Sequence, residues 1–243
     1  MKKYPVVILP GWLLGSKRFL GLAQEFEKQG YKTYIVDFPG FEDEVRLSSA
    51  LNLTDYVKYL QQFLRRQNIT RAVFIGHSFG GRVALKMLSQ EPKKASALIL
   101  SGTPGLPGIT KFRFYVTVAL VKAGKLVSFI PPFIFFRKLL REFFKKITRA
   151  HDYYRSDGLL RETFKNIVKE QLVEYMKKLR VPTLLLWGES DRLVSVKIAR
   201  KMQRLILKSQ LVVVPKMGHM FTYREPKVFV GYALKYLESQ PTK

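Results

Sequence analysis

The sequence predicts an α/β protein: a mostly parallel sheet of about six strands, covered by helices on both faces and interrupted by an inserted helical cap. Three observations lead to this prediction. Short runs of β-forming residues alternate with stretches in which apolar residues recur at helical spacing. The expected strands are apolar throughout, which is typical of parallel strands buried on both faces. One long interval, residues 104–180, breaks the alternation.

The first half of the chain contains four expected strands with helices between them. Ser16 and Thr54 are predicted to cap two of the helices, because their hydroxyls can accept from first-turn amides. Gly30 is expected to end the first helix. The expected elements, in chain order, are strand 6–9, helix 16–29, strand 34–36, helix 55–66, strand 72–75, helix 82–88 and strand 97–100.

The alternation returns after residue 180. A strand is expected at 183–187, a helix at 196–205, a strand at 211–214 and a last helix at 225–237. We therefore expect residues 1–103 and 181–243 to form one α/β core. Residues 104–180 are expected to form a helical cap over the carboxyl ends of the strands, where open α/β sheets bind their ligands.

The predicted cap is strongly basic and amphipathic. Residues 111–180 contain 17 Lys and Arg against six Asp and Glu, a local net charge of +11. Within 132–149, one helical face is apolar and the opposite face is cationic. The apolar face is expected to line a pocket for the substrate through Phe136, Leu140, Phe143 and Phe144, and the cationic face carries Lys138, Arg141, Lys145 and Lys146.

The whole chain is basic as well. Its 243 residues contain 43 Lys and Arg against 18 Asp and Glu, a formal charge of +25. A field of this size attracts anionic surfaces. An anionic membrane or an acidic carrier protein is the expected partner if one exists, and no specific nucleic acid is expected. Charge that only keeps the protein soluble is the other interpretation.

Two further features bear on where the protein works. The start, Met1-Lys2-Lys3 before an apolar run, imitates a signal peptide, but Pro10-Gly11 interrupts the run and no small-residue cleavage site follows. We interpret the run as the first strand. No stretch qualifies as a membrane span. The protein is therefore expected in the cytoplasm, and the absence of cysteine excludes disulfides and thiolate chemistry.

The hexapeptide 76–81, Gly-His-Ser-Phe-Gly-Gly, stands between an expected strand and an expected helix. This is the context that a G-x-S-x-G nucleophile elbow requires. The turn forces Ser78 into a strained backbone conformation, so small residues are needed at Gly76 and Gly80. Ser78 is the predicted nucleophile.

A serine hydroxyl needs a base within hydrogen-bond reach. The chain has three histidines. His77 lies inside the elbow and is expected to point away from the site as a packing residue. His151 lies among charged residues of the predicted cap and is expected to be exposed. His219 follows the last strand in a glycine turn, so it is the predicted base.

The base in turn needs a carboxylate that fixes its tautomer. Asp191 follows the strand 183–187 and lies between Ser78 and His219. The order serine, acid, histidine is the one that accompanies a G-x-S-x-G elbow. Glu189 is the local competitor, and Asp191 is preferred because it lies further out on the loop. Asp37 is expected to support a turn.

The oxyanion that develops on the substrate needs two fixed donors. One is expected to be the backbone N–H of Phe79, directly after the nucleophile. The other is expected in the loop after the first strand, where Gly11 permits close approach of the backbone. We assign it to the N–H of Trp12, whose side chain can serve as a core aromatic as well.

Taken together, five motifs carry a resemblance that covers nearly the whole chain outside the cap. They are Leu9-Pro10-Gly11-Trp12, Asp37 to Phe41, Gly76 to Gly81, Trp187 to Val194 and Gly218-His219. They resemble the α/β-hydrolase superfamily, most closely its small esterase branch, which includes the pimeloyl-acyl-carrier-protein methyl ester carboxylesterases. The resemblance implies a triad of Ser78, Asp191 and His219, with Trp12 and Phe79 as oxyanion donors.

The expected function is hydrolysis of carboxylic esters with short-to-medium acyl chains through an acyl-enzyme, without a cofactor or a metal. An apolar acyl group suits the Phe-rich cap. Thioesterases, lactonases and carbon–carbon bond hydrolases share the same triad and stay open. A non-catalytic protein that binds an anionic membrane or an acidic partner through the basic cap is the alternative from another class.

Overall fold

The computed structural model describes residues 3–41, 47–106 and 158–240. In this part of the chain, six strands form one parallel sheet with the order β2-β1-β3-β4-β5-β6. The strands are β1 (Val6–Leu9), β2 (Thr33–Ile35), β3 (Ala72–His77), β4 (Ala95–Ser101), β5 (Thr183–Gly188) and β6 (Ser209–Val214). The predicted parallel sheet with helices on both faces is confirmed.

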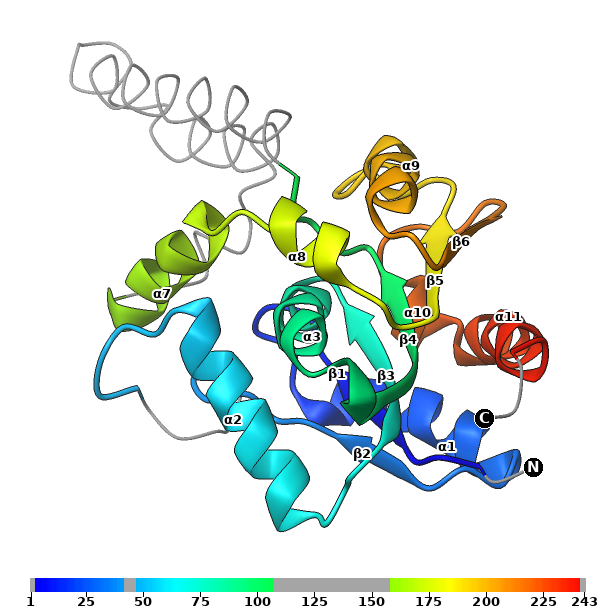
Figure 1. The fold of residues 1–243 in the computed structure, drawn as a ribbon, viewed down its shortest axis with the longest axis horizontal. Helices are drawn as coiled ribbons and strands as arrows, with labels where there is room; N and C mark the ends of the chain where they lie inside the picture. The colour runs from blue at the N-terminus through cyan, green and yellow to red at the C-terminus, as the bar shows by residue number, and fades with distance from the viewer. Residues whose placement is uncertain (1–2, 42–46, 107–157, 241–243) are drawn as a thin grey trace, which may run out of the picture.

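Helices connect the strands and cover both faces of the sheet (Figure 1). Side chains alternate along each strand, so Val7 and Leu9 enter one core and Val6 and Ile8 the other. One face packs against α2 (Leu53–Arg66), α3 (Phe79–Gln90), α8 (Val173–Lys178) and α9 (Val196–Leu205), and the other against α1 (Leu20–Lys28) and α11 (Pro226–Glu238).

The remaining elements are short or lie within the interval predicted as the insertion. The 3₁₀ turns η1 (Ser16–Phe19) and η2 (Pro92–Lys94) precede α1 and β4, and α10 (Phe221–Arg224) precedes α11. Helix α7 (Gly158–Lys169) and α8 lie within the interval predicted as a cap, and both pack on the core. The rest of that interval, residues 107–157, lies outside the described residues, so the division into core and cap stays a prediction.

Several boundaries and caps differ from the prediction. Helix α2 is capped by Asn52 and not by Thr54: the Asn52 side chain accepts from the amides of Thr54 and Asp55, and Asp55 accepts from Asn52 N–H in return. Ser16 begins a 3₁₀ turn, and its amide donates to Asp37 Oδ1 at 2.7 Å. Asp37 therefore supports the loop, as predicted.

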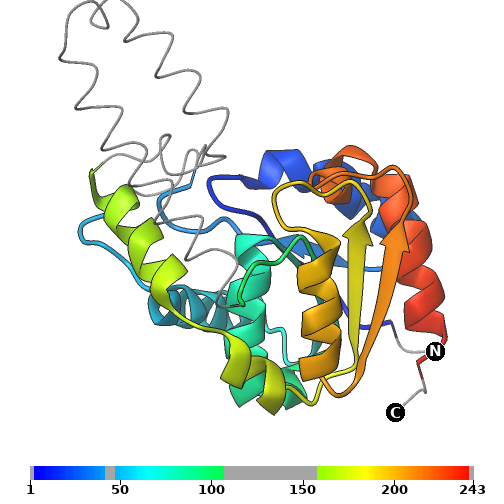
Figure 2. The same cartoon turned by 90° about the horizontal axis from the view of Figure 1, so that it is seen from above.

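The chain order places a topological switch point between β1 and β3. From β1 the chain moves outward to β2, then returns past β1 to β3. Ligands of open α/β sheets bind where the order reverses, at the carboxyl ends of the strands. The loops that follow β1 and β3 carry Trp12 and Ser78. Figure 2 shows β5 and β6 running in the same direction beside α9.

Candidate active site

Ser78 lies between the last residue of β3 and the first residue of α3. Its backbone has φ 50° and ψ −110°, a conformation that costs free energy for any residue with a Cβ. Its N–H donates to Ser101 O at 2.8 Å, which holds the turn against the end of β4. The side chain is partly exposed. The strained elbow predicted from the sequence is therefore present.

Close packing explains the glycines around this turn. A Cβ at Gly80 would lie 2.1 Å from Leu9 O, and one at Gly76 would lie 2.6 Å from Gly81 Cα. The amide of Gly80 also donates to Pro10 O at 2.9 Å. The N-terminus of α3 is consequently seated directly on the end of β1. First-turn amides have no acceptor within their own helix, so this is where an anionic oxygen is best stabilised.

Asp191 follows β5 in a turn that holds its carboxylate in place. Oδ1 accepts from the amides of Leu193 at 2.9 Å and Val194 at 2.8 Å, and Oδ2 lies 2.8 Å from Nδ1 of His219. The Asp191 side chain is only 1% exposed and that of His219 12%. Two amide donors stabilise a carboxylate without using the oxygen that faces the histidine.

Glu189, the competing acid, lies elsewhere. It is exposed, and its Oε2 accepts from the amide of Lys216 at 3.1 Å. This hydrogen bond fixes the loop between β6 and α10 at a second point, in addition to the contact between His219 and Asp191. Of the two acids, Asp191 is the one that contacts His219.

His219 lies over the ends of β3 and β4. Its ring centroid is 4.9 Å from that of His77, the residue before Ser78. A Cβ added at Gly102, directly after β4, would lie 2.6 Å from Cε1 of His219 and 2.7 Å from Nδ1. Ser78, His219 and Asp191 thus gather at the carboxyl edge of the sheet, from loops that follow β3, β6 and β5.

His77 does not point away from this site. Its fully buried ring packs against His219, and its Nδ1 lies 3.3 Å from the hydroxyl of Thr222, which donates to Ser101 Oγ at 2.8 Å. Burial holds the pKa of His77 well below its usual value, and the neighbouring His219 lowers it further. His77 is therefore neutral. In the sequence, the only sign that the His77 ring is buried beside the site is its position at the end of an apolar strand.

The two predicted oxyanion residues are joined by an aromatic cluster. The ring of Trp12 packs edge-on against Phe79 at 5.5 Å and Phe41 at 4.9 Å, and Phe79 packs against Tyr56 at 4.9 Å. Edge-to-face packing at these distances is favourable and fixes ring orientation. Phe164 of α7 extends the cluster, 5.3 Å from Trp12. The predicted pocket residues Phe136, Leu140, Phe143 and Phe144, as well as His151, lie outside the described residues.

The family model described as the alpha/beta hydrolase fold matches residues 4–226. The chain belongs to the α/β-hydrolase family. It is a hydrolase, as its curated relatives are. The match includes both strands at the switch point and all three loops that meet at the site.

Relatives and solved structures agree with this family. The chain is 27% identical to the AB hydrolase superfamily protein YisY of Bacillus subtilis, covering 91% of this chain and 87% of that protein. It is 23% identical to a 2-hydroxy-6-oxononadienedioate/2-hydroxy-6-oxononatrienedioate hydrolase of Pseudomonas (92% and 83% covered). It is 25% identical to the monoacylglycerol lipase ABHD6 of Rattus norvegicus (98% and 76%).

The esterase of Exiguobacterium antarcticum has a similar fold, with a TM-score of 0.75, 21% identity and coverage of 98% of this chain and 93% of that one.

In the part of the chain that the structure describes, no helix is both long enough and apolar enough to cross a membrane.

Proposed function

We propose that this hydrolase is a serine carboxylesterase in which Ser78 is the nucleophile, His219 the general base and Asp191 the acid that orients the base. The observation that carries the proposal is the 2.8 Å contact between His219 Nδ1 and Asp191 Oδ2, next to a serine in a strained elbow. An acid bound to Nδ1 leaves Nε2 as the nitrogen that can accept the serine proton.

In the proposed reaction, Ser78 Oγ attacks the ester carbonyl carbon while its proton moves to His219 Nε2. The carbonyl oxygen becomes an oxyanion that accepts from the amides of Trp12 and Phe79. The intermediate then expels the alcohol, which takes the proton from His219, and the acyl group remains on Ser78. Water, deprotonated by His219, releases the carboxylic acid and restores the serine.

The short-to-medium acyl preference, predicted from the Phe-rich cap, is also supported by the apolar surroundings of Trp12. Phe41, Phe79 and Phe164 pack their rings against this residue, so apolar side chains lie beside the proposed oxyanion donors. Apolar walls with a few polar groups are typical of small-molecule sites. A pimeloyl-acyl-carrier-protein methyl ester is one substrate that the sequence motifs suggest.

Kinetics of single variants test the assignment of roles. Replacing Ser78 or His219 by Ala is expected to lower kcat by roughly 10⁴-fold or more, and Asp191→Asn by several orders of magnitude. Glu189→Gln is the matched control, because Glu189 is exposed and accepts from Lys216 only through one oxygen. If Glu189→Gln lowered kcat strongly and Asp191→Asn only slightly, the acid would be Glu189 and the proposed role of Asp191 would be wrong.

Carbon–carbon bond hydrolysis is the second candidate, and the similarity to the Pseudomonas hydrolase favours it. A substrate panel separates the two. Acyl p-nitrophenyl esters from C2 to C12, thioesters, lactones and a vinylogous 1,5-diketone acid are compared by kcat/KM. The proposal predicts that the esters are the best substrates.

A further inference from the structure

Two cations on α3 are buried where this helix meets the end of α7, within the interval predicted as the cap. Arg82 is 5% exposed and Lys86, one turn later, is 7% exposed. Burying a charge is costly unless it is paired or hydrogen-bonded. The helix begins directly after Ser78, so both cations are fixed relative to the nucleophile. Each cation must therefore find its acceptors within the fold.

Arg82 forms hydrogen bonds with both parts of the interval 104–180 that the structure describes: the segment that leaves β4 and the segment at the end of α7. One terminal nitrogen donates to Ile167 O at 2.6 Å and Glu170 O at 2.7 Å, and the other donates to Pro104 O at 3.3 Å. Pro104 lies where the chain leaves β4, and Ile167 lies in the last turn of α7. A guanidinium there gives the carbonyls of Ile167 and Glu170 a charged donor and matches the negative end of the dipole of α7.

Packing beside Arg82 joins the same two segments. The amide of Leu172 donates to Gly105 O at 3.3 Å. A Cβ at Gly105 would lie 2.6 Å from Cδ1 of Leu172, so a larger residue there would force the Leu172 side chain to shift. The outgoing and returning chains are consequently in direct contact.

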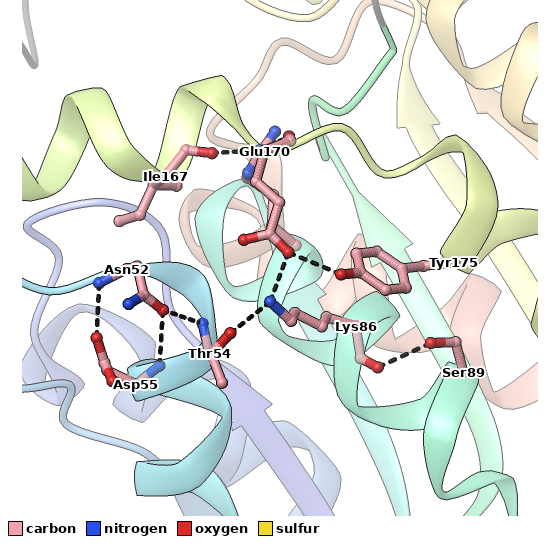
Figure 3. A network of polar contacts seen from close by, with 9 residues as sticks. Asn52, Thr54, Asp55, Lys86, Ser89, Ile167, Glu170 and Tyr175 are labelled. Carbon is pink, nitrogen blue, oxygen red and sulfur yellow. Dashed lines mark hydrogen bonds and ion pairs between the residues drawn. The ribbon is translucent and has the colours of Figure 1, made fainter.

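Lys86 fixes the end of α7 from the other side (Figure 3). Its ammonium group lies 2.5 Å from Glu170 Oε1 and donates to Thr54 Oγ1 of α2 at 2.6 Å, while the hydroxyl of Tyr175 on α8 donates to the same carboxylate oxygen at 2.9 Å. Side chains of α2, α3 and α8 thus meet beside Glu170, the residue that follows α7. Burial lowers the pKa of Arg82 to about 10, and Glu170 opposes the shift, so Arg82 is charged at neutral pH.

The body of α7 is held over the aromatic cluster. The buried Thr163 accepts from Leu51 N–H through its hydroxyl at 2.9 Å. Phe164, the next residue, packs on Trp12 at 5.3 Å. Leu160 lies one turn earlier and reaches Gly40, where an added Cβ would lie 3.0 Å from its Cδ2. Helix α7 thus covers the loop that carries the proposed oxyanion donor.

We propose that α7 is a fixed wall of the substrate pocket, placed over Trp12 by the positioning residues Arg82 and Lys86, and that Phe164 on this wall selects esters with apolar acyl chains. The inference rests on the proposed esterase function. It assigns acyl-chain specificity to α7, in addition to the pocket residues predicted within 132–149. Fixing the wall to α3 sets its distance from Ser78, which starts that helix.

Trp12 reports the position of this wall without any turnover. The chain has two tryptophans, and Trp187 is fully buried on β5. In a Trp187→Phe background, fluorescence comes from Trp12 alone, which is 7% exposed under Phe164. Arg82→Gln and Lys86→Met are expected to release α7, shift the Trp12 emission to longer wavelength and increase its quenching by acrylamide. Arg82→Lys, which can donate to the same carbonyls, is expected to recover part of the effect.

Arg71→Gln is the matched control. Its guanidinium is half-buried and donates to Tyr4 OH at 3.3 Å, at the start of β3 and away from α7. It is expected to leave Trp12 emission and quenching unchanged. A general loss of stability from removing a buried cation would affect both variants, whereas release of α7 affects only Arg82→Gln.

Acyl selectivity is measured with both tryptophans present. Phe164→Ala is expected to change the ratio of kcat/KM between decanoyl and acetyl esters by about tenfold or more, the size that one altered apolar pocket contact produces. Arg82→Gln is expected to change this ratio in the same direction, mainly through KM for the long ester. Lys86→Met should follow Arg82→Gln.

Decanoate binding separates this inference from the esterase proposal. Decanoate is expected to protect Trp12 from acrylamide in the parent and not in Phe164→Ala. If no ester is hydrolysed but this protection is seen, the esterase proposal fails and the wall stands. Folded Arg82→Gln with unchanged Trp12 quenching would overturn the positioning role. An unchanged acyl ratio and unchanged protection in Phe164→Ala would overturn the selectivity role.

Discussion

At Gly102 the backbone leaves β4 in the left-handed region, with φ 57°, and passes directly beside the ring of His219. A methyl group there would overlap Cε1 at 2.6 Å, and the backbone conformation would also be strained. The Asp191 carboxylate lies close to the same position: its Oδ2 would be 3.4 Å from the added Cβ and is 2.8 Å from His219 Nδ1, so the histidine has little room to move. Side-chain volume at this one position therefore controls the geometry of the proposed base.

Gly102→Ala is expected to lower kcat by roughly 10²-fold, because a displacement of about 1 Å in a reacting group costs that much. Gly231→Ala on α11 is the control, since no described atom lies within 4 Å of its added Cβ. Ester hydrolysis and thermal unfolding are measured for both. Full activity in a folded Gly102→Ala protein would contradict the position assigned to His219.

His77 makes stability depend on pH. Its pKa in the folded state is well below 6.5, mainly because of burial, whereas the unfolded chain titrates near 6.5. As the pH falls below 6.5, the unfolded state takes up a proton that the folded state does not. The free energy of unfolding then decreases by up to about 1.4 kcal/mol per pH unit from this group.

His77→Gln removes that proton uptake, and its amide can still contact Thr222. Urea unfolding between pH 7.5 and 5 is expected to show a shallower loss of stability for the variant than for the parent. The His219–Asp191 pair faces His77 and is present in both proteins, so the comparison isolates His77. Equal slopes would mean that His77 is not held neutral.

Among the elements, α2 shows how a helix start is determined. Asn52 accepts from two first-turn amides, and Asp55 accepts from Asn52 N–H at 2.9 Å, a complete capping box. The hydroxyl of Thr54, which the sequence favoured as the cap, instead accepts from Lys86 at 2.6 Å. The Thr54 side chain therefore makes a tertiary contact with α3, and the helix is capped by Asn52 instead.

Asn52→Ala is expected to lower the free energy of unfolding by about 1 kcal/mol, and Asn52→Gly by only a few tenths, because glycine is itself tolerated at an N-cap. Denaturant unfolding of the two variants measures the difference. Equal losses for Ala and Gly would indicate that the side chain acts through something other than the cap.

Local pattern predicted the elements that depend on their own residues. The helix at 196–205 was predicted with its exact bounds, since its apolar face repeats cleanly and Ser195 caps it. The docking of α7 depends on pairs such as Leu51 and Thr163, 112 residues apart, which no local pattern contains. The elbow at Ser78 could be predicted from the sequence because the strained turn requires glycines close to the serine, all within residues 76–81. His77, Gly102 and Phe164 gain their roles from contacts between distant loops.

For the molecule as a whole, the sequence gives the sign of the charge but not its arrangement. Helix α9 carries four exposed cations along one face and no acid: Lys197, Arg200, Lys201 and Arg204. They recur at spacings of three and four residues, so they form one stripe. The basic helix predicted within 132–149 lies outside the described residues, and the anionic membrane partner inferred from it stays a proposal.

Co-sedimentation with anionic vesicles tests whether α9 contributes to that proposal. Binding is expected at low salt and to weaken at high salt, because exposed charges are screened beyond about 8 Å at physiological ionic strength. Replacing the four α9 cations by Gln should reduce binding more than replacing Lys28, Lys32, Lys227 and Lys235 on the opposite face of the sheet. Equal reductions would assign binding to net charge alone.

Labelling with a fluorophosphonate tests the central claim most directly, because the probe reacts only with a serine that a neighbouring base activates. The account predicts one covalent adduct per chain, located at Ser78 by peptide mass spectrometry. The adduct should be absent in Ser78→Ala and strongly reduced in His219→Ala, and unchanged in Glu189→Gln. An unlabelled parent protein, or an adduct that persists in Ser78→Ala, would contradict the account.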